Sequence, residues 1–177
     1  LEFSDEEKEF VKGLFMITSK PVLYACNVSE DDIMNGTSEN DYVKQVREYA
    51  KKENSEVMVV CAKLEEDLSG LEDEEKAEML KEYGLEESGL DKLIQASYKL
   101  LGLMSFLTAG EQEVRAWTIK MGTKAPKAAG KIHSDIERGF IRAEIVTFDD
   151  LVECGSEAKA KEKGLYRLEG KDYVMQD

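Results

Sequence analysis

The chain has 177 residues, of which 42% are hydrophobic and 35% charged, and its formal net charge is −14. This length allows one or two domains with a sizeable core, whereas no apolar run approaches the length of a membrane span. No secretory signal opens the sequence, and the three cysteines lack metal-ligand spacing. We therefore expect a reduced, cytoplasmic protein with no metal site and no membrane partner.

The first apolar pattern predicts a helix over about residues 5–17. Ser4 and Glu7 have the spacing of a capping box, in which each side chain satisfies the other residue's backbone N–H. Apolar side chains then recur at helical spacing at Phe10, Val11, Leu14 and Phe15. We expect this amphipathic helix to pack on a sheet.

Two apolar runs on either side of a helical segment predict a βαβ unit. The first run, residues 22–26, follows Pro21, and the second spans residues 56–62. Because both runs are almost continuously apolar, they suit strands that are buried on both faces of a parallel sheet. The crossover helix between them, which ends near residues 53–54, makes the two strands parallel.

Polar segments follow both predicted strands. Ligands of open α/β sheets lie just beyond the carboxyl ends of the strands, so Asn27 and Glu30 are placed to meet a ligand. Residues 61–63 form a second loop one βα unit later. For each loop an alternative stays open: residues 27–32 can simply cap the next helix, and residues 61–63 can be an ordinary strand-to-helix connection.

The sequence changes character at Gly102. Before it, residues 67–83 predict a charged helix that stops at Gly84, and a further helix runs from Ser88 to Gly102. After it, the predicted elements are strands at 104–109 and 114–121 joined across residues 110–113, a short helix from Pro126 to about Ile136, a strand at 140–146, a short helix near 148–152, and a last hairpin of 165–168 with 173–175. This order is typical of a β-grasp domain, and we place a domain boundary between residues 1–102 and 103–177.

The charge is uneven along the chain. Residues 115–142 contain seven Lys or Arg and two Asp or Glu, in an otherwise acidic sequence. Such a stretch can bind phosphates, and Trp117 could stack on RNA bases. The alternative is that Trp117 belongs to the core of the hairpin and that the charges are only solvated. The candidate RNA-binding or ribosome-binding residues are Arg115, Lys120, Lys124, Lys127, Lys131 and Arg142.

The first loop resembles a known nucleotide-binding motif. Asn27-Val28-Ser29-Glu30 is similar to the Asn-Lys-x-Asp motif with which P-loop GTPases recognise guanine, but Val replaces Lys and Glu replaces Asp. This departure matches the Obg-like ATPase (YchF) family, whose members carry Asn-x-x-Glu. The resemblance implies a preference for ATP, with Asn27 and Glu30 reading the base and with Val28, Ser29, Cys61, Ala62 and Lys63 lining its pocket.

Four later segments resemble the TGS domain of the same family, a ubiquitin-like β-grasp module. They are residues 114–118, 128–135, 139–144 and 168–173. Two features of the family are absent from this sequence. Its phosphate-binding loop, Gly-x-x-x-x-Gly-Lys-Ser/Thr, occurs nowhere, and the last short strand that usually follows is not included.

Together these patterns predict an α/β fold, in which the C-terminal part of a Ras-like P-loop NTPase domain (1–102) precedes a TGS domain (103–177). The resemblance implies a longer parent protein that binds and hydrolyses ATP, or GTP, with Mg²⁺ held by ligands outside this chain, and that engages the ribosome or RNA. We expect no catalytic residue in the chain and no activity from it alone. The alternative is a non-catalytic β-grasp module that binds RNA or protein partners.

Overall fold

The computed structural model describes residues 3–110 and 113–176, which divide into two units at the junction of Leu101 and Gly102. In the first unit, strand β1 (Leu23–Asn27) pairs in parallel with β2 (Glu56–Val60), in a register that joins Leu23 to Glu56 and Asn27 to Val60. The predicted parallel βαβ unit is therefore confirmed. No helix in the described part of the chain is long and apolar enough to cross a bilayer.

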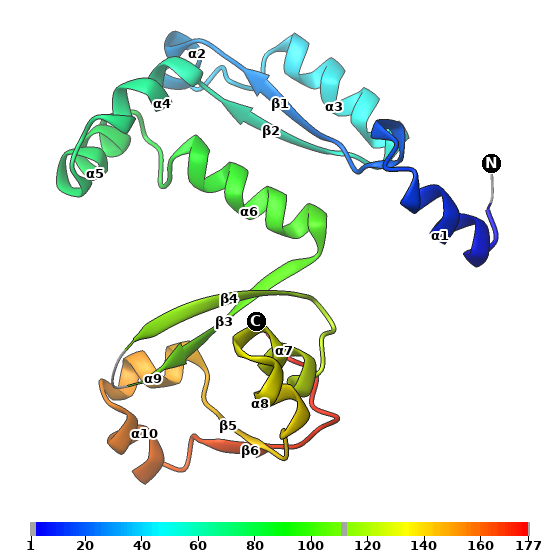
Figure 1. Cartoon of the computed structure of the whole chain (residues 1–177). Coiled ribbons are helices and arrows are strands. Elements are labelled where there is room, and N and C mark those ends of the chain that lie inside the picture. Colours follow the sequence, from blue (N-terminus) through cyan, green and yellow to red (C-terminus); the bar gives the residue numbers. More distant parts are fainter. Residues whose placement is uncertain (1–2, 111–112, 177) are drawn as a thin grey trace. The chain divides into compact units, whose positions relative to one another are not determined.

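Helices cover both faces of this two-stranded sheet. Helix α3 (Asp41–Glu53) connects the strands on one face, and α6 (Gly89–Leu101) lies on the other (Figure 1). Asn40 caps α3 by accepting hydrogen bonds from two backbone N–H groups, and Asn54 ends it in a left-handed conformation. The unit is thus a small α/β/α stack whose two strands end at the same edge.

The core of the first unit lies under that edge. It consists of Val28, Val43, Cys61, Leu64 and Leu68, so the residues that follow the two strands are packed together with α3 and with helix α4 (Ala62–Ser69). The sequence predicted one helix over residues 67–83, and this prediction is wrong. The chain breaks after α4, and α5 (Asp73–Glu82) begins anew at Glu72, which forms a capping box with Glu75. Leu71, in the break, packs against the core, so burial there outweighs helix continuity.

The N-terminal helix is shorter and less buried than expected. Helix α1 (Asp5–Gly13) has the predicted capping box of Ser4 and Glu7. It ends because Phe15 adopts a left-handed conformation with φ of 53°, and a short 3₁₀ helix, η1 (Ile17–Ser19), precedes β1. No described residue of α1 is buried, and Phe10 is 71% exposed. The expectation that this helix packs on the sheet is therefore wrong.

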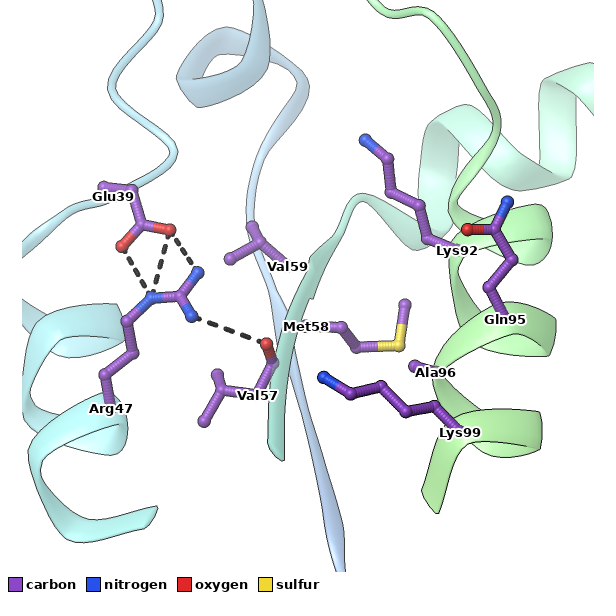
Figure 2. Close-up of a pocket in the computed structure, with 9 residues that line it drawn as sticks. All are labelled: Glu39, Arg47, Val57, Met58, Val59, Lys92, Gln95, Ala96 and Lys99. Carbon is purple, nitrogen blue, oxygen red and sulfur yellow. Dashed lines mark hydrogen bonds and ion pairs between the residues drawn. The ribbon is translucent and has the colours of Figure 1, made fainter. Parts of the chain in front are cut away.

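An arginine covers the outer edge of β2. Arg47 of α3 forms an ion pair with Glu39 and also donates from Nη1 to the carbonyl oxygen of Val57 at 3.4 Å. Figure 2 shows this arginine at one side of an open groove of about 470 Å³, with Met58 and the α6 side chains at the other. A charged side chain that donates a hydrogen bond to a carbonyl oxygen on the free edge of a strand disfavours pairing of that edge with a strand from another molecule.

The second unit begins with the predicted hairpin. Strands β3 (Leu103–Ala109) and β4 (Val114–Lys120) are antiparallel, with Leu103 opposite Lys120. The predicted turn at residues 110–113 lies partly outside the described residues. Helix α7 (Ala125–Ile132) packs on this hairpin, where Met104, Ile119 and Ala128 form a buried cluster.

Three predictions in the second unit are corrected by the structure. The helix predicted from Pro126 to Ile136 is broken at His133, whose Nδ1 accepts from the Asp135 N–H and caps α8 (Ser134–Arg138). The strand predicted over 140–146 is only β5 (Ala143–Ile145), since Phe140 instead enters the core beside α7. The last predicted hairpin does not form, because β6 (Arg167–Glu169) pairs antiparallel with β5 and Val174 bridges to Lys124.

Two short helices connect β5 with β6. They are α9 (Phe148–Cys154), which Thr147 caps near the predicted position, and α10 (Glu157–Glu162), which Ser156 caps. The C-terminal segment then returns to the hairpin side of the unit, since the Met175 N–H donates to the Thr123 carbonyl at 2.9 Å. Met175 contacts both buried clusters, so this late residue completes the core.

Candidate functional site

The two loops that follow β1 and β2 are joined by a side chain. Oδ1 of Asn27, the last residue of β1, accepts a hydrogen bond from the backbone N–H of Ala62 at 2.9 Å. One residue later, the Val28 N–H donates to the Val60 carbonyl at 2.9 Å and extends the strand pairing into the loops. The structure therefore brings residues 27–30 and 61–63, which are 31 or more positions apart in sequence, to one edge of the sheet.

Some residues of the predicted base pocket also hold the fold. Ser29 caps the short helix α2 (Glu30–Met34): its Oγ accepts from the Asp32 N–H at 3.1 Å and donates to the Asp32 carboxylate at 2.8 Å. The Asp32 carboxylate also accepts from the backbone N–H of Ser29. The bond from the Ser29 hydroxyl is the main cause that lowers the pKa of Asp32, and the bond from the backbone N–H is the second. The alternative reading of this loop as a helix cap is therefore correct for Ser29. Val28 and Cys61 are buried in the core.

Glu30 is held by a tyrosine from a distant helix end. The Tyr83 hydroxyl donates to Oε1 of Glu30 at 3.2 Å, across 53 positions of sequence. Partial burial is the main cause that raises the pKa of Tyr83, and the charge of Glu30 and this hydrogen bond raise it further. Tyr83 was missed by the sequence analysis, which assigned it only to the end of a charged helix. No local pattern marks it, because its relation to Glu30 depends on the turn between α4 and α5.

Lys63 lies in the same neighbourhood but is directed to another partner. Its Nζ contacts Oδ1 of Asp67 at 2.7 Å, one turn further along α4. The hydrogen bond to Asp67 is the main cause that raises the pKa of Lys63, and the charge of Glu30 adds to it. Glu30, Lys63, Asp67 and Tyr83 therefore form a polar group beside the Asn27–Ala62 connection.

The other side of the first loop borders a hollow. A depression of about 420 Å³ is lined by β1, by residues 27–29 and by the α3 residues Tyr42, Val43 and Val46. Asn27 and Ser29 thus border an open space and remain exposed, while Glu30 and residues 61–63 lie outside its lining. Within the described residues, no group of three or more His, Cys, Asp or Glu is arranged to hold a metal ion.

The predicted RNA-binding residues are all exposed, but those on the hairpin do not share one face. Arg115 lies over the ring of Trp117, with Cζ at 4.3 Å from the ring centroid. Trp117 is only half-buried, and its Nε1 donates to Oγ1 of Thr108 at 2.9 Å, so the tryptophan belongs to the hairpin and still offers part of its ring. Lys120, five positions after Arg115 on the same strand, points to the opposite face of the hairpin.

The remaining basic residues differ in their ionic partners. Lys124 contacts Asp172 at 2.7 Å, and Lys127 contacts Glu137 at 2.5 Å. For Lys131 and Arg142 no ion pair is found among the described residues. Local carboxylates thus pair with two of the six cations, whereas the described residues show no ion pair for Arg115, Lys120, Lys131 or Arg142.

The chain is similar to known proteins over its whole length. Residues 103–177 match a family model described as YchF-GTPase_C, a protein of unknown function (DUF933). The whole chain is 59% identical to the ribosome-binding ATPase YchF of Bacillus subtilis and covers 48% of that protein. It is 42% identical over 178 residues to Obg-like ATPase 1 of Xenopus laevis, in an alignment that covers 99% of the chain and 44% of the relative.

A solved structure is also similar to this chain. The YchF GTPase of Schizosaccharomyces pombe superposes with a TM-score of 0.83 at 35% sequence identity, over the whole of this chain and 47% of that one. The chain therefore spans about half the length of the relatives that it matches. The similarity extends through both units, since it covers the chain from end to end.

Proposed function

We infer that this chain is part of a YchF/Obg-like ATPase, and we propose that it carries the base-recognition loops and the ribosome-docking domain of an ATP-preferring P-loop NTPase. In this proposal Asn27 and Glu30 read the purine. Val28, Ser29 and residues 61–63 line the space around it. The rest of the parent protein supplies the phosphate-binding loop and the Mg²⁺ ligands.

The hydrogen bond between Asn27 and Ala62 carries this proposal. A base that lies beyond the strand ends needs two loops in fixed relation, and the Asn27 side chain fixes them by accepting from the Ala62 N–H at 2.9 Å. The same amide keeps its NH₂ group, which can donate to an acceptor on the base. An Asn that capped only the helix following it would accept from α2, whereas Asn27 accepts from the first N–H of α4, 35 positions away.

The surface of the first unit supports a larger parent protein. In the described residues, β1 pairs only with β2, and the hollow beside Tyr42 is open along β1. The apolar side chains of Leu90 and Ile94 on α6 are exposed. Exposed apolar faces and an unpaired strand edge are costly in water, so we propose that the rest of the parent's NTPase domain covers them.

The chemistry of Glu30 supports the choice of adenine. The Watson–Crick edge of adenine offers one exocyclic amine donor and one ring acceptor, while guanine offers two adjacent donors there. A carboxylate that accepts from guanine with both oxygens must lie in a position where each oxygen faces one of those two donors. Glu30 has one methylene more than the Asp of the GTPase motif, and one of its oxygens already accepts from Tyr83.

Equilibrium titration of the full-length parent protein with fluorescent ATP and GTP tests the proposal. We expect tighter binding of ATP, and we expect Glu30→Asp to shift the preference toward GTP because the shorter carboxylate restores the guanine-reading geometry. Asp31→Glu, a carboxylate change at the neighbouring position, is the control and should leave the preference unchanged. Equal affinities for ATP and GTP in the unmutated protein would defeat the proposal.

The second unit completes the proposed function. We propose that residues 103–177 form a TGS-type β-grasp domain that docks RNA or a ribosomal surface, and that the domain boundary lies at residues 102–103. Its support is the set of exposed cations on a rigid hairpin and helix scaffold, together with the ribosome-binding names of the relatives. Co-sedimentation of the parent protein with ribosomes over a salt series tests this part, because phosphate contacts weaken as salt rises.

A further inference from the structure

The hydroxyl group of Tyr83 occupies one oxygen of the carboxylate assigned to base reading. Its Oη donates to Oε1 of Glu30 at 3.2 Å, and both side chains are partly buried. Tyr83 itself is held in place, since it packs against the core cluster that contains Val28 and Cys61. The position of this hydroxyl is therefore set by the same core that sets the two loops.

Two contacts restrict where the Glu30 carboxylate can turn, and the nearby cation is engaged elsewhere. Tyr83 holds Oε1 on the side of α5. Lys63, the nearby cation, is hydrogen-bonded to Asp67 and so does not neutralise the Glu30 carboxylate directly. The backbone of Glu30 is fixed at the first position of α2 by the Ser29 cap. The second oxygen, Oε2, has no described hydrogen bond and is the one left to accept from a ligand.

We propose that Tyr83 is a positioning residue that biases Glu30 toward adenine and against guanine, an inference that rests on the proposed function of Glu30. With Oε1 engaged by Tyr83, Oε2 is the oxygen without a described hydrogen bond, and one free oxygen is sufficient for the lone exocyclic amine of adenine. Guanine presents two adjacent donors and binds best to a carboxylate with both oxygens available. The tyrosine thus competes with guanine for Oε1 and weakens the two-point contact that would favour guanine.

The experiment compares ATP and GTP affinities of the full-length parent protein and of its Tyr83→Phe variant. Phenylalanine keeps the ring in the core and removes only the hydroxyl group. We expect the ratio of the GTP to the ATP dissociation constant to fall by about 2- to 10-fold, the range for loss of one ordinary intramolecular hydrogen bond. Part of this change should come from tighter GTP binding, which a merely structural defect would not produce.

Tyr49→Phe is the matched control. The Tyr49 hydroxyl also donates to a glutamate, Oε1 of Glu53 at 2.8 Å, so this variant loses the same type of hydrogen bond at the far end of α3. It should leave the ratio unchanged. In a Glu30→Gln background, Tyr83→Phe should also have no effect on the ratio, because the two residues act through one contact.

The outcomes separate the two proposals. A parent protein that prefers ATP, with a ratio that Tyr83→Phe leaves unchanged, overturns the role of Tyr83 and leaves the proposed function intact. Equal loss of ATP and GTP affinity in Tyr83→Phe also overturns it, since that result marks a structural role only. A parent protein without any preference overturns both, because no discrimination then exists for Tyr83 to strengthen.

Discussion

The backbone N–H of Gly89 donates to Oε1 of Glu65 at 2.6 Å, and the next N–H, that of Leu90, donates to Oε2 at 3.1 Å. One carboxylate of α4 thereby satisfies two of the free donors at the start of α6, where a negative charge is also favoured by the helix dipole. Because α4 begins at Ala62, this contact anchors residues 61–63 to the helix on the other face of the sheet.

Gly89 cannot be enlarged without disturbing that junction. A Cβ placed there would lie 2.6 Å from Cγ2 of Val60 and 2.8 Å from Oε1 of Glu65. We predict that Gly89→Ala lowers the free energy of unfolding by about 1–3 kcal/mol, the usual cost of overpacking. Urea denaturation of the chain measures it. Gly70→Ala is the control, because a Cβ there meets no atom within 4 Å, and a similar loss in both variants would refute the steric explanation.

The connection between Asn27 and Ala62 leads to a second prediction. Asn27→Ala removes the acceptor for the Ala62 N–H, so we expect a loss of about 0.5–1.5 kcal/mol in unfolding free energy together with weaker nucleotide binding by the parent protein. Asn27→Asp keeps an oxygen in place and should retain most of the stability. Denaturation curves and nucleotide titrations give the two quantities. Full nucleotide affinity in Asn27→Ala would show that the loops need no such connection.

The charges of the second unit predict unequal effects on ribosome binding. Charge reversal of Lys131 and Arg142, or of Arg115 and Lys120, should weaken co-sedimentation of the parent protein with ribosomes and reduce its salt dependence. Reversal of Lys124 and Lys127, whose charges are already paired with Asp172 and Glu137, should have the smaller effect. Equal effects of all three pairs would indicate a general loss of charge, and unchanged sedimentation would contradict RNA docking by this unit.

Two tyrosines around Glu53 predict a pH dependence of stability. Hydrogen bonds from Tyr24, and then Tyr49, lower the pKa of Glu53, while the same bonds are the main cause that raises the pKa of each tyrosine. The glutamate's contribution is present above its unfolded pKa of about 4.3 and is lost as the pH falls through the lower folded value. The tyrosines' contribution is present below about pH 10 and is lost as the pH rises through their higher folded pKa values.

The measurement compares urea midpoints of the chain and of the Tyr24→Phe plus Tyr49→Phe double variant across this pH range. The double variant should be less stable between these limits, and the difference should shrink toward both ends. Tyr42→Phe, at a side chain that is 80% exposed, is the control. Both variants keep the two rings, which meet edge to face at 6.1 Å, so a difference in stability that does not vary with pH would contradict a contribution from the hydrogen bonds to Glu53.

Much of the scaffold of the site follows from the sequence alone. Two continuous apolar runs on either side of an amphipathic segment predict parallel strands, and parallel strands bring their carboxyl ends to one edge. The proximity of Asn27 to residues 61–63 is therefore a consequence of topology, and the structure shows it directly. The hairpin of β3 and β4 is likewise predicted by two strand-like segments on either side of a short polar turn.

Other features depend on contacts that no local pattern encodes. The break between α4 and α5 accompanies the packing of Leu71 against the core of the first unit. In the second unit, β6 pairs with β5 and not with residues 173–175. Those later residues serve the core instead, where Tyr173 and Met175 pack against the cluster that contains Phe140. Both outcomes were missed because burial of a few apolar side chains outweighed the local preference for a continuous helix or a hairpin.

The hydrogen bond from Tyr83 to Glu30 belongs with these features, since it joins residues 53 positions apart through a turn whose course depends on packing. Periodicity reports which face of an element is buried, because burial acts on each residue according to its own polarity. It does not report which distant residue will contact a given side chain, because that contact depends on the packing of the whole core. The strands and the edge where the loops meet could thus be inferred from the order of residues, whereas the side chain that holds the carboxylate there emerged only from the assembled core.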